Sequence, residues 1–291
     1  MAENKLNWQS KLVLLAVLPF AGTEVVLDWN WWVSQGAPVA IWAIGLSVLL
    51  GLVTWRLRAA TPAGALTGAL ITASLMFSTV VVPYQPWHTA LIPILAVSML
   101  AFIATRAGRH RKEQLGTAEG RKGRAASQVA ANLGLAAMAV SSPVQSWLAD
   151  SRWVPHHAAT PAMLFTLAVA ALAEAAADTV SSELGQVLGG RPRMITSFKS
   201  VDPGRDGAIS VAGTLAGLVA AAIVAYAGMW ALGGGWILFT VSCAGAVFGL
   251  FFDSLLGATL EERGLLNNDA VNFLSTASAA GFALAVLCAM H

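Results

Sequence analysis

The sequence predicts an all-α, polytopic membrane protein with about nine transmembrane helices, and composition and apolar pattern carry this prediction. Hydrophobic residues make up 57% of the 291 positions and charged residues only 11%, against about 25% charged residues in soluble domains. The mean hydropathy is +0.68. Apolar runs of about 20 residues, the length that spans a bilayer, recur along the chain. Because a soluble fold could not bury this much apolar surface, residues 1–291 are expected to form a single transmembrane domain.

Nine segments have the length and composition of membrane spans. Short connections rich in Trp, Pro and polar residues separate them, as is typical of the membrane–water interface. The first apolar run follows a basic N-terminus but lacks a small-residue cleavage site, so it predicts a span and not a signal peptide. The expected spans are 11–27, 38–55, 63–82, 87–105, 127–147, 158–177, 208–232, 235–256 and 270–290.

The basic residues predict the orientation. With nine spans, 16 of the 17 Lys and Arg fall on one side of the membrane, and only Arg152 falls on the other. The positive-inside rule places the basic side, with the N-terminus, in the cytoplasm and the C-terminus outside. A multi-pass protein of the cell inner membrane, with its active site facing the cytoplasm, is therefore expected. The segments on the basic side are 1–10, 56–62, 106–126, 178–207 and 257–269.

Two of the cytoplasmic segments are long and differ in character. Segment 106–126 is basic, and a topology anchor that touches anionic lipid headgroups would explain it. Segment 178–207 mixes acids, bases, hydroxyls, Gly and Pro without an amphipathic order. A long ordered loop of this kind is more often functional than idle, so the second segment is the better candidate for a site.

Carboxylates lie within or beside the apolar spans. Glu174, Asp178 and Ser182 are spaced i, i+4, i+8, which places them on one helix face. Asp253 lies inside an otherwise apolar span. A charge facing lipid near the bilayer centre costs about 2.5–3.5 kcal/mol, so these groups should face the bundle interior or a wet cavity. Such oxygens suit Mg²⁺. The alternatives are a helix end that meets water and a structural ion pair between helices.

Segment 191–210 has the composition of a phosphate site. Arg binds phosphate in bidentate fashion and Lys as a point charge, and Gly lets backbone N–H groups approach an anion. A helix expected to begin near Ala208 would favour an anion at its N-terminus. No GxxxxGK[ST] loop occurs, so a nucleotide site here would be of another kind. The candidate residues are Arg193, Thr196, Lys199, Pro203, Gly204, Asp206, Gly207 and Ser210.

Amide side chains form two further candidate pairs. Asn132 lies one turn after Gln128 at the start of the fifth span, and Asn272 lies one turn after Asn268 at the start of the last. Hydrogen bonds between helices, a helix cap, and contacts to a ligand all remain open for these residues. No His/Cys cluster has metal-ligand spacing, and neither a nucleophile elbow nor a Rossmann fingerprint occurs.

Five motifs carry a family resemblance. They read RKEQLGTAEGRKGRAASQVAANLG, ADTVSSELG, GRPRMITSFKSVDPGRDGAISVAGTLAG, DSLLGATLE and NNDAVNFLST. In this order they resemble a family of integral membrane proteins whose best-understood members are the phytyl-phosphate kinases of plastids and cyanobacteria. The resemblance covers residues 63–291, the expected catalytic region. It is more specific for the family than for a substrate.

The resemblance implies a kinase that phosphorylates an isoprenyl monophosphate (phytyl, farnesyl or geranylgeranyl phosphate) to the diphosphate, with CTP as the favoured donor. The family is also distantly similar to CTP-dependent polyisoprenol kinases and membrane cytidylyltransferases, in which a carboxylate-rich helix end precedes a Lys and a Pro-Gly loop. The order Asp178, Lys199, Pro203-Gly204 is similar here. The loop departs from the usual Pro-Gly-Thr-x-Gly-Gly, since it ends in Gly207-Ala208.

A hypothesis for the site follows from the resemblance. Asp178 and Asp253, with Glu183, would hold Mg²⁺ against the nucleotide phosphates, and Arg193 and Lys199 would neutralise the transferred group. The remaining predicted binding residues are Asn132, Glu174, Ser182, Thr196, Pro203, Gly204, Asp206, Gly207, Ser210, Asn268 and Asn272.

The expected partners are a nucleotide, an isoprenoid phosphate lipid and the membrane. No nucleic acid is expected, and the sequence leaves a homodimer open. Three alternatives stand beside the kinase: a cytidylyltransferase acting on a lipid phosphate, a transporter or flippase of a phosphorylated lipid, and a non-catalytic scaffold. Polar residues gathered at one face, and the lack of an inverted repeat, argue against the transporter.

Overall fold

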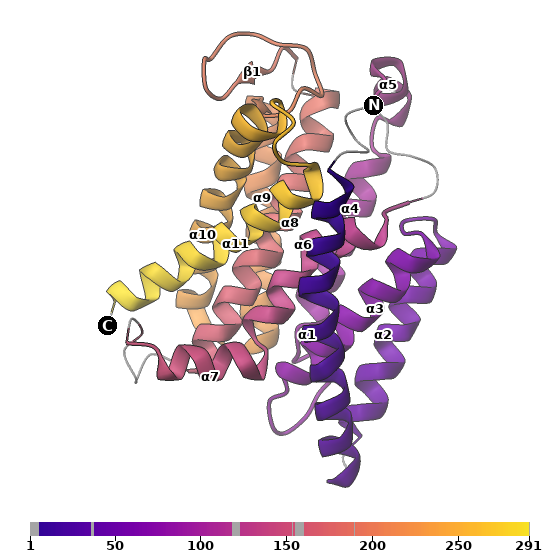
Figure 1. The fold of residues 1–291 in the computed structure, drawn as a ribbon, viewed down its shortest axis with the longest axis vertical. Coiled ribbons are helices and arrows are strands. Elements are labelled where there is room, and N and C mark those ends of the chain that lie inside the picture. Colours follow the sequence, from indigo (N-terminus) through magenta and orange to yellow (C-terminus); the bar gives the residue numbers. More distant parts are fainter. Residues whose placement is uncertain are drawn as a thin grey trace.

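The described residues form a bundle of helices with one short hairpin (Figure 1). The computed structural model describes residues 6–35, 38–117, 123–152, 154, 160–188 and 190–290. A π-helix, η1 (Gly257–Glu261), continues α10, and the hairpin consists of β1 (Arg193–Met194) and β2 (Ala208–Ile209). The other elements are α1 (Asn7–Ser34), α2 (Val39–Arg56), α3 (Pro62–Ser78), α4 (Leu91–Arg106), α5 (Arg109–Leu115), α6 (Ala126–Ala139), α7 (Ser142–Asp150), α8 (Pro161–Leu188), α9 (Val211–Leu232), α10 (Gly235–Leu256) and α11 (Asn268–Ala289).

Six helices of the described chain are long and apolar enough to cross a membrane: α1, α2, α8, α9, α10 with η1, and α11. A seventh span results if α4 and α5, which meet at a 62° bend, are counted together. The apolar helix α3 is shorter, with 17 residues. The prediction of a polytopic helical membrane protein is confirmed, while nine spans and the orientation of the termini stay predictions.

Three predicted segments differ from the structure. The predicted span 127–147 divides into α6 and α7, because Pro143 near the start of α7 has no N–H to continue a helical hydrogen-bond ladder. The predicted loop 178–207 begins later, since α8 continues to Leu188. Segment 106–126 is not all loop, because the short helix α5 lies within it.

Helix α8 forms the centre of the bundle. Every side chain from Met163 to Ala177 is buried, and α4, α6, α9, α10 and α11 pack around it (Figure 1). Glycines allow the close approach of α9: a Cβ added at Gly213 would lie 2.6 Å from Ser181 O, and one at Gly217 would lie 2.8 Å from Ala177 O. Small residues at such contacts are the usual means of helix association in membranes.

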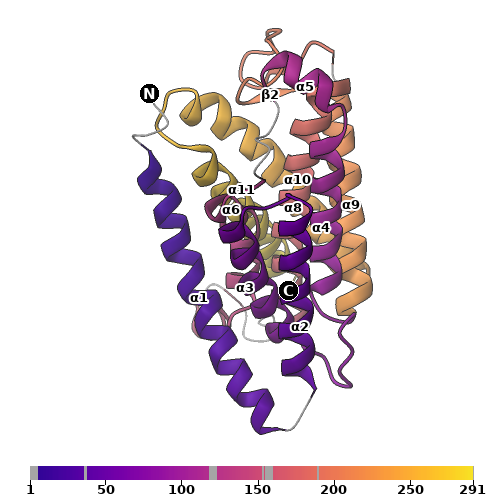
Figure 2. The same ribbon diagram turned by 90° about the vertical axis from the view of Figure 1, so that its right-hand side faces the viewer.

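Helices α1, α2 and α3 form a second group that packs on the centre through α6 (Figure 2). Their outer faces, like those of α9 and α10, expose large apolar side chains such as Leu15, Ile41, Val219 and Trp236. Exposed apolar surface of this extent marks an interaction surface, and in a chain with these spans the surrounding lipid accounts for it.

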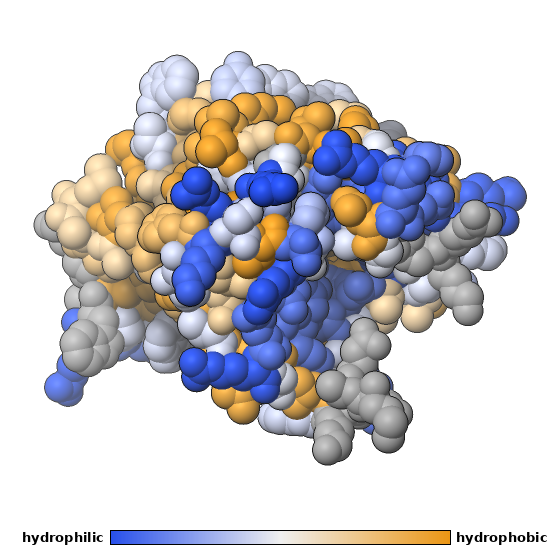
Figure 3. Space-filling view, turned by 90° about the horizontal axis from the view of Figure 1, so that it is seen from above, coloured by the Kyte–Doolittle hydropathy of each residue, from blue (hydrophilic) through white to orange (hydrophobic). Residues whose placement is uncertain are grey.

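Basic loops gather at one end of the bundle, which we call the basic end; it carries α5, the hairpin and η1 (Figure 1). Arg106 Nη2 donates a hydrogen bond to Leu57 O at 2.6 Å, and Ala60 pairs with Arg124. These contacts join the loop before α3 to the end of α4 and to the loop before α6. Seen from this end, hydrophilic residues form a band across the middle of the face, bordered by hydrophobic ones (Figure 3).

Candidate functional site

A polar cavity of about 130 Å³ lies at the basic end, between α6, α8 and the start of α11. Seven residues singled out from the sequence line it, on three helices that lie far apart in the chain. The structure therefore brings together the amide pairs and part of the acidic motif. The lining residues are Arg124, Gln128, Asn132, Asp178, Thr179, Ser182, Glu183, Asn268 and Asn272.

Helical spacing explains why these side chains converge. Residues four apart project from the same side of a helix, so Asp178 with Ser182, and Asn268 with Asn272, each present two groups to the cavity. Asn132 Nδ2 donates a hydrogen bond to the backbone carbonyl of Gln128 at 2.8 Å, and this bond does not use the amide oxygen of Asn132. The helix cap of α11 is Asn267, whose side chain accepts from the N–H of Ala270. Asn268 and Asn272 are thus not needed as caps.

Carboxylates meet beside this cavity, between α8, α10 and η1. Asp178 faces Asp253. The carboxylates of Glu174 and Glu261 are also close enough to Asp253 to act on it electrostatically. In the described chain, Glu174 Oε1 and Asp253 Oδ2 are buried atoms with no hydrogen-bond partner. The absence of a side chain at Gly249 makes room for Glu174, because a Cβ there would overlap its Cγ. Desolvated carboxylates this close together are costly without a neighbouring cation.

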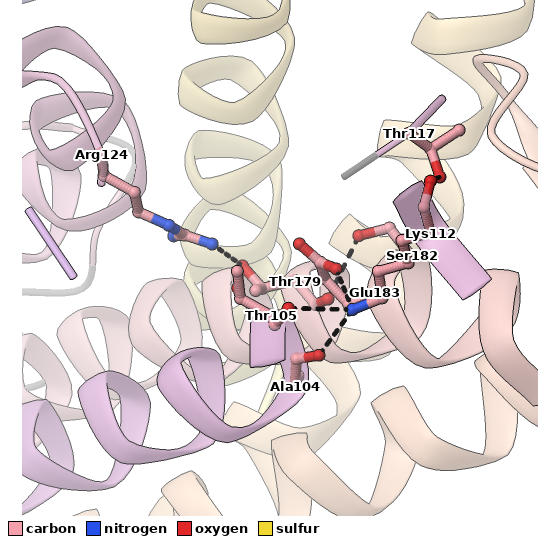
Figure 4. A network of polar contacts seen from close by, with 8 residues as sticks. All are labelled: Ala104, Thr105, Lys112, Thr117, Arg124, Thr179, Ser182 and Glu183. Atoms are coloured by element: carbon pink, nitrogen blue, oxygen red, sulfur yellow. Dashed lines mark hydrogen bonds and ion pairs between the residues drawn. The ribbon is translucent and has the colours of Figure 1, made fainter. Parts of the chain in front are cut away.

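Two basic side chains of the segment between α4 and α6, Lys112 and Arg124, contact side chains of α8 (Figure 4). Arg124 Nη2 donates to Thr179 Oγ1 at 3.3 Å, and its charge acts on Asp178. Lys112 Nζ donates to Glu183 Oε2 at 2.5 Å, and to the carbonyls of Ala104 at 2.8 Å and Thr105 at 3.2 Å. The site thus combines acidic and basic side chains that are buried or partly buried.

The sequence analysis missed Lys112 and Arg124, because it treated the whole basic segment 106–126 as one anchor. For Lys112 the anchor interpretation is wrong: the residue is 1% exposed, so its ammonium group faces Glu183 and not lipid headgroups. One signal was available, since both residues belong to the first of the five family motifs.

A second, larger cavity of about 670 Å³ adjoins the first. It lies between α2, α3, α4 and α6, and its lining is mostly apolar. Arg124 and Asn132 line both cavities, so the two spaces meet at these side chains. The lining residues of the larger cavity are Leu50, Gly51, Thr54, Arg58, Ala59, Ala60, Gly64, Gly68, Thr72, Ile94, Val97, Ser98, Ala101, Phe102, Thr105, Arg106, Arg109, Glu113, Gly123, Arg124, Val129, Asn132, Leu133 and Ala175.

Comparison with known proteins assigns the family. The sequence profile of the integral membrane protein family DUF92 matches residues 45–280. The chain belongs to this family. The family resemblance carried by the motifs is thereby confirmed. No solved structure shows significant similarity to the chain.

Individual relatives of this DUF92 chain come from archaea, cyanobacteria and plants. A membrane protein of Synechocystis is 31% identical over 211 residues, which cover 69% of the chain and 74% of that protein. A membrane protein of Methanocaldococcus jannaschii is 42% identical over 37% of the chain and 45% of its own length. The chloroplastic protein VTE6 of Arabidopsis thaliana is 31% identical over 62% of the chain and 54% of that protein. The chain thus matches only about half of two of these relatives.

The hairpin of this DUF92 protein places three predicted phosphate-binding residues on the surface. Arg193, Thr196 and Lys199 are exposed, and at the start of the connection between β1 and β2 the N–H of Met194 donates to Lys199 O at 2.9 Å. None of the three is among the residues that line the polar cavity. The structure therefore does not bring Arg193 and Lys199 together with Asp178 and Asp253.

The predicted phosphate turn packs against protein atoms. Gly204 (φ +86°) lies against Thr117, and Gly207 (φ +73°) lies against Ala258 of η1, so closely that a Cβ would overlap them. The N–H of Ala208 donates to Arg205 O at 3.1 Å. Pro203 is partly buried in the same turn. These contacts give both glycines a packing role, and binding of phosphate here stays a prediction.

Two further predicted residues have structural neighbours at this turn. Ser210 caps α9, because its hydroxyl accepts the N–H of Gly213 at 3.1 Å. The pKa of Asp206 is raised, mainly by partial desolvation and to a smaller extent by the neighbouring Glu262 carboxylate. Acidic side chains thus crowd the outer side of the turn, and the ion pair of Arg205 with Glu262 offsets part of their charge.

The carboxylates fit Mg²⁺ only in a limited way. In the described ranges, no group of three or more His, Cys, Asp or Glu is placed to hold a metal ion. Glu183, a predicted ligand, pairs with Lys112. Asp178 and Asp253 remain, and the unpartnered Oδ2 of Asp253 is free to accept a cation. Mg²⁺ in phosphoryl-transfer sites takes one or two carboxylates and completes its shell with water and phosphate oxygens, so this pair is compatible with Mg²⁺, and its binding here stays a prediction.

Proposed function

We propose that this protein is a prenyl-phosphate kinase, which transfers a phosphoryl group from a nucleoside triphosphate, CTP being favoured, to an isoprenyl monophosphate. One observation carries the proposal: Asp178, which faces Asp253, lines a polar cavity together with Arg124, and this cavity adjoins a mostly apolar one. A polar head and an apolar tail of one substrate would need this combination. Membership of DUF92 and the likeness to phytyl-phosphate kinases support the same class.

Phosphoryl transfer needs positioning and charge neutralisation more than covalent help from the protein. An oxygen of the acceptor phosphate attacks the γ-phosphorus of the nucleotide, the bond to the β–γ bridging oxygen breaks, and the nucleoside diphosphate leaves. The acceptor is already an anion, so no strong general base is required. The product is the prenyl diphosphate.

Each group of the site has a role in this proposal. Asp178 and Asp253 would hold Mg²⁺, which would supply positive charge to neutralise the nucleotide phosphates. Arg124 orients the acceptor phosphate beside them, and Asn132, Asn268 and Asn272 supply hydrogen bonds to the polar parts of the substrates. Arg193 and Lys199, on the exposed hairpin, contact the nucleotide phosphates from outside. The supporting observation is the shared lining of the two cavities.

The basic end faces the cytoplasm in this proposal, and the chain crosses the cell inner membrane. Sixteen of 17 basic residues on one side of the predicted spans support this orientation. Nucleoside triphosphates are available on that side. A cytoplasmic active site is therefore compatible with both the charge distribution and the proposed donor.

The test uses the purified chain in detergent with farnesyl or geranylgeranyl phosphate, Mg²⁺ and each of the four nucleoside triphosphates, with products identified by mass. Formation of a prenyl diphosphate, fastest with CTP, is expected. The matched control is Asp150→Asn, which changes an exposed acid on α7 away from both cavities. A lipid carrying CMP would identify a cytidylyltransferase instead. No product with any donor and chain length would show the kinase proposal to be wrong.

A further inference from the structure

The larger cavity is a continuous apolar space between four helices. On α3, Gly64, Gly68 and Thr72 are spaced four apart, so one face of that helix lines it along about 12 Å. Ile94 and Val97, in the half of α4 away from the basic loops, also line it. Such a space binds a ligand through apolar contact along its length, as ligand pockets of 300–1,000 Å³ commonly do.

The opposite end of this cavity carries four arginines. Among the lining residues that the structure describes, Glu113 is the one acid, and it pairs with Arg109 at 3.0 Å. The guanidinium of Arg106 lies 4.0 Å from the centre of the Phe102 ring, which holds it at the rim. One end of the cavity thus carries a surplus of positive charge and the other end carries none. Such a space is complementary to a ligand with an anionic head and an apolar chain. The four are Arg58, Arg106, Arg109 and Arg124.

We infer that this cavity binds the isoprenoid chain of a single-chain lipid phosphate, with the phosphate held at Arg124 and the chain between α3 and α4. The inference rests on the proposed function for the reaction itself. What it adds is the position of the acceptor lipid in the structure. Arg124 lines both cavities, so a phosphate held there lies at the border of the carboxylate site. The head of the lipid would thus meet the nucleotide while its tail stays in the larger space.

The volume favours one chain. If each group of the chain takes about the 30 Å³ of a water molecule, about 670 Å³ holds roughly 20 such groups. A farnesyl or geranylgeranyl chain is of this size, whereas two long acyl chains exceed it. Phosphatidic acid shares the phosphate monoester but not the single chain. We therefore take the prenyl phosphate as the occupant, and phosphatidic acid as the competitor to be tested.

Gly68 offers a way to fill the cavity without disturbing the helices. A Cβ at this position would meet only Val129 Cγ1, at 3.6 Å, which is ordinary contact. Gly68→Phe would therefore place its ring in the space proposed for the chain. Gly45→Phe is the matched control, because Gly45 lies on α2, outside the cavity lining, with nothing within 4 Å of its added Cβ.

The experiment is photolabelling of the purified chain with farnesyl phosphate that carries a diazirine at the tail end, followed by mapping of the labelled peptides. Labels are expected on α3 and α4, reduced at least tenfold in Gly68→Phe and unchanged in Gly45→Phe. Excess geranylgeranyl phosphate should compete and phosphatidic acid should not. Labels elsewhere, equal labelling of Gly68→Phe, or equal competition by phosphatidic acid would overturn the inference.

The kinetic arm separates the two proposals. Gly68→Phe is expected to raise KM for geranylgeranyl phosphate at least tenfold, with little change for dimethylallyl phosphate, whose chain is short. If Gly68→Phe does not fold, Gly68→Leu and the labelling map of the unmodified chain decide. Photolabelling does not require turnover. A protein that is labelled as expected but forms no product would therefore refute the proposed kinase function and support the proposed lipid site. Diphosphate formation without a chain-length effect of the variant would refute the lipid site alone.

Discussion

Lys112 Nζ lies 2.5 Å from Glu183 Oε2, and this ion pair joins the short helix α5 to the central helix α8. The side chain of Lys112 is 1% exposed and that of Glu183 is 14% exposed. Two backbone carbonyls at the end of α4 accept the remaining protons of the ammonium group. The pair therefore fixes the segment that leads to Arg124 against the helix that carries Asp178.

Replacing Lys112 alone should be strongly destabilising. Lys112→Met leaves the Glu183 carboxylate without its partner, and breaking a buried pair on one side costs about 3–5 kcal/mol. The measurement is the free energy of unfolding in detergent, with the double variant Lys112→Met/Glu183→Gln as control. The double variant should recover much of the loss, because it removes both charges. Equal loss in the single and double variants would contradict the ion-pair explanation.

Arg124 should matter more to turnover than the exposed bases of the hairpin. Removing one preorganised donor beside a transferred phosphoryl group costs about 10²–10³-fold in kcat, and we expect this for Arg124→Gln. Arg193→Gln and Lys199→Gln should act chiefly on KM for the nucleotide, since both side chains are exposed and lie outside the cavity lining. Steady-state kinetics of the three variants checks this. A larger kcat loss in the hairpin variants would favour the assignment made from the sequence.

The two facing carboxylates should be essential for turnover but not for folding. Asp178→Asn and Asp253→Asn keep the size of each side chain and remove its charge, so we expect at least a 10²-fold loss of product formation. Because charges crowd this buried site, unfolding stability should stay equal or increase. Product formation and the thermal unfolding midpoint are measured together, with Asp150→Asn as control. Full activity in both variants would exclude these residues as metal ligands.

Gly207 should tolerate no side chain. At φ +73° any other residue costs about 1–2 kcal/mol, and its Cβ would also overlap the backbone of Ala258 in η1. Gly190 is the matched control, because it has φ +63° but nothing within 4 Å of an added Cβ. We expect Gly207→Ala to lower the unfolding midpoint clearly more than Gly190→Ala. Equal effects would mean that the contact between turn and η1 contributes nothing to stability.

The sequence predicted those parts of the site that depend on spacing within one helix. Asp178 with Ser182, and Asn268 with Asn272, converge because residues four apart share a helix face. It did not predict Lys112 and Arg124, since their partners lie 71 and 55 residues away and only tertiary packing brings them together. The break between α6 and α7 was missed because a proline near a helix start is compatible with either one bent span or two helices.

The same limit applies to acids that serve structure. Glu24, in the long apolar helix α1, is 2% exposed. Its Oε1 accepts the N–H of Ser142 at 2.7 Å, and its Oε2 accepts the hydroxyl of Ser142 at 3.2 Å. Ser142 is the first residue of α7, so a carboxylate from another helix satisfies a free N–H at that helix end. The position of Glu24 within an apolar helix would by itself have suggested a functional residue.

Glu24→Ala should therefore destabilise the protein without changing the chemistry of the site. Loss of an N-terminal cap costs about 0.5–2 kcal/mol, and the charge of the carboxylate places this contact towards the upper end. Glu24→Gln keeps an acceptor oxygen and should lose less. The measurement is the unfolding midpoint in detergent together with turnover per folded molecule. Loss of turnover with an unchanged midpoint would show that Glu24 takes part in the reaction, although it lies far from the basic end.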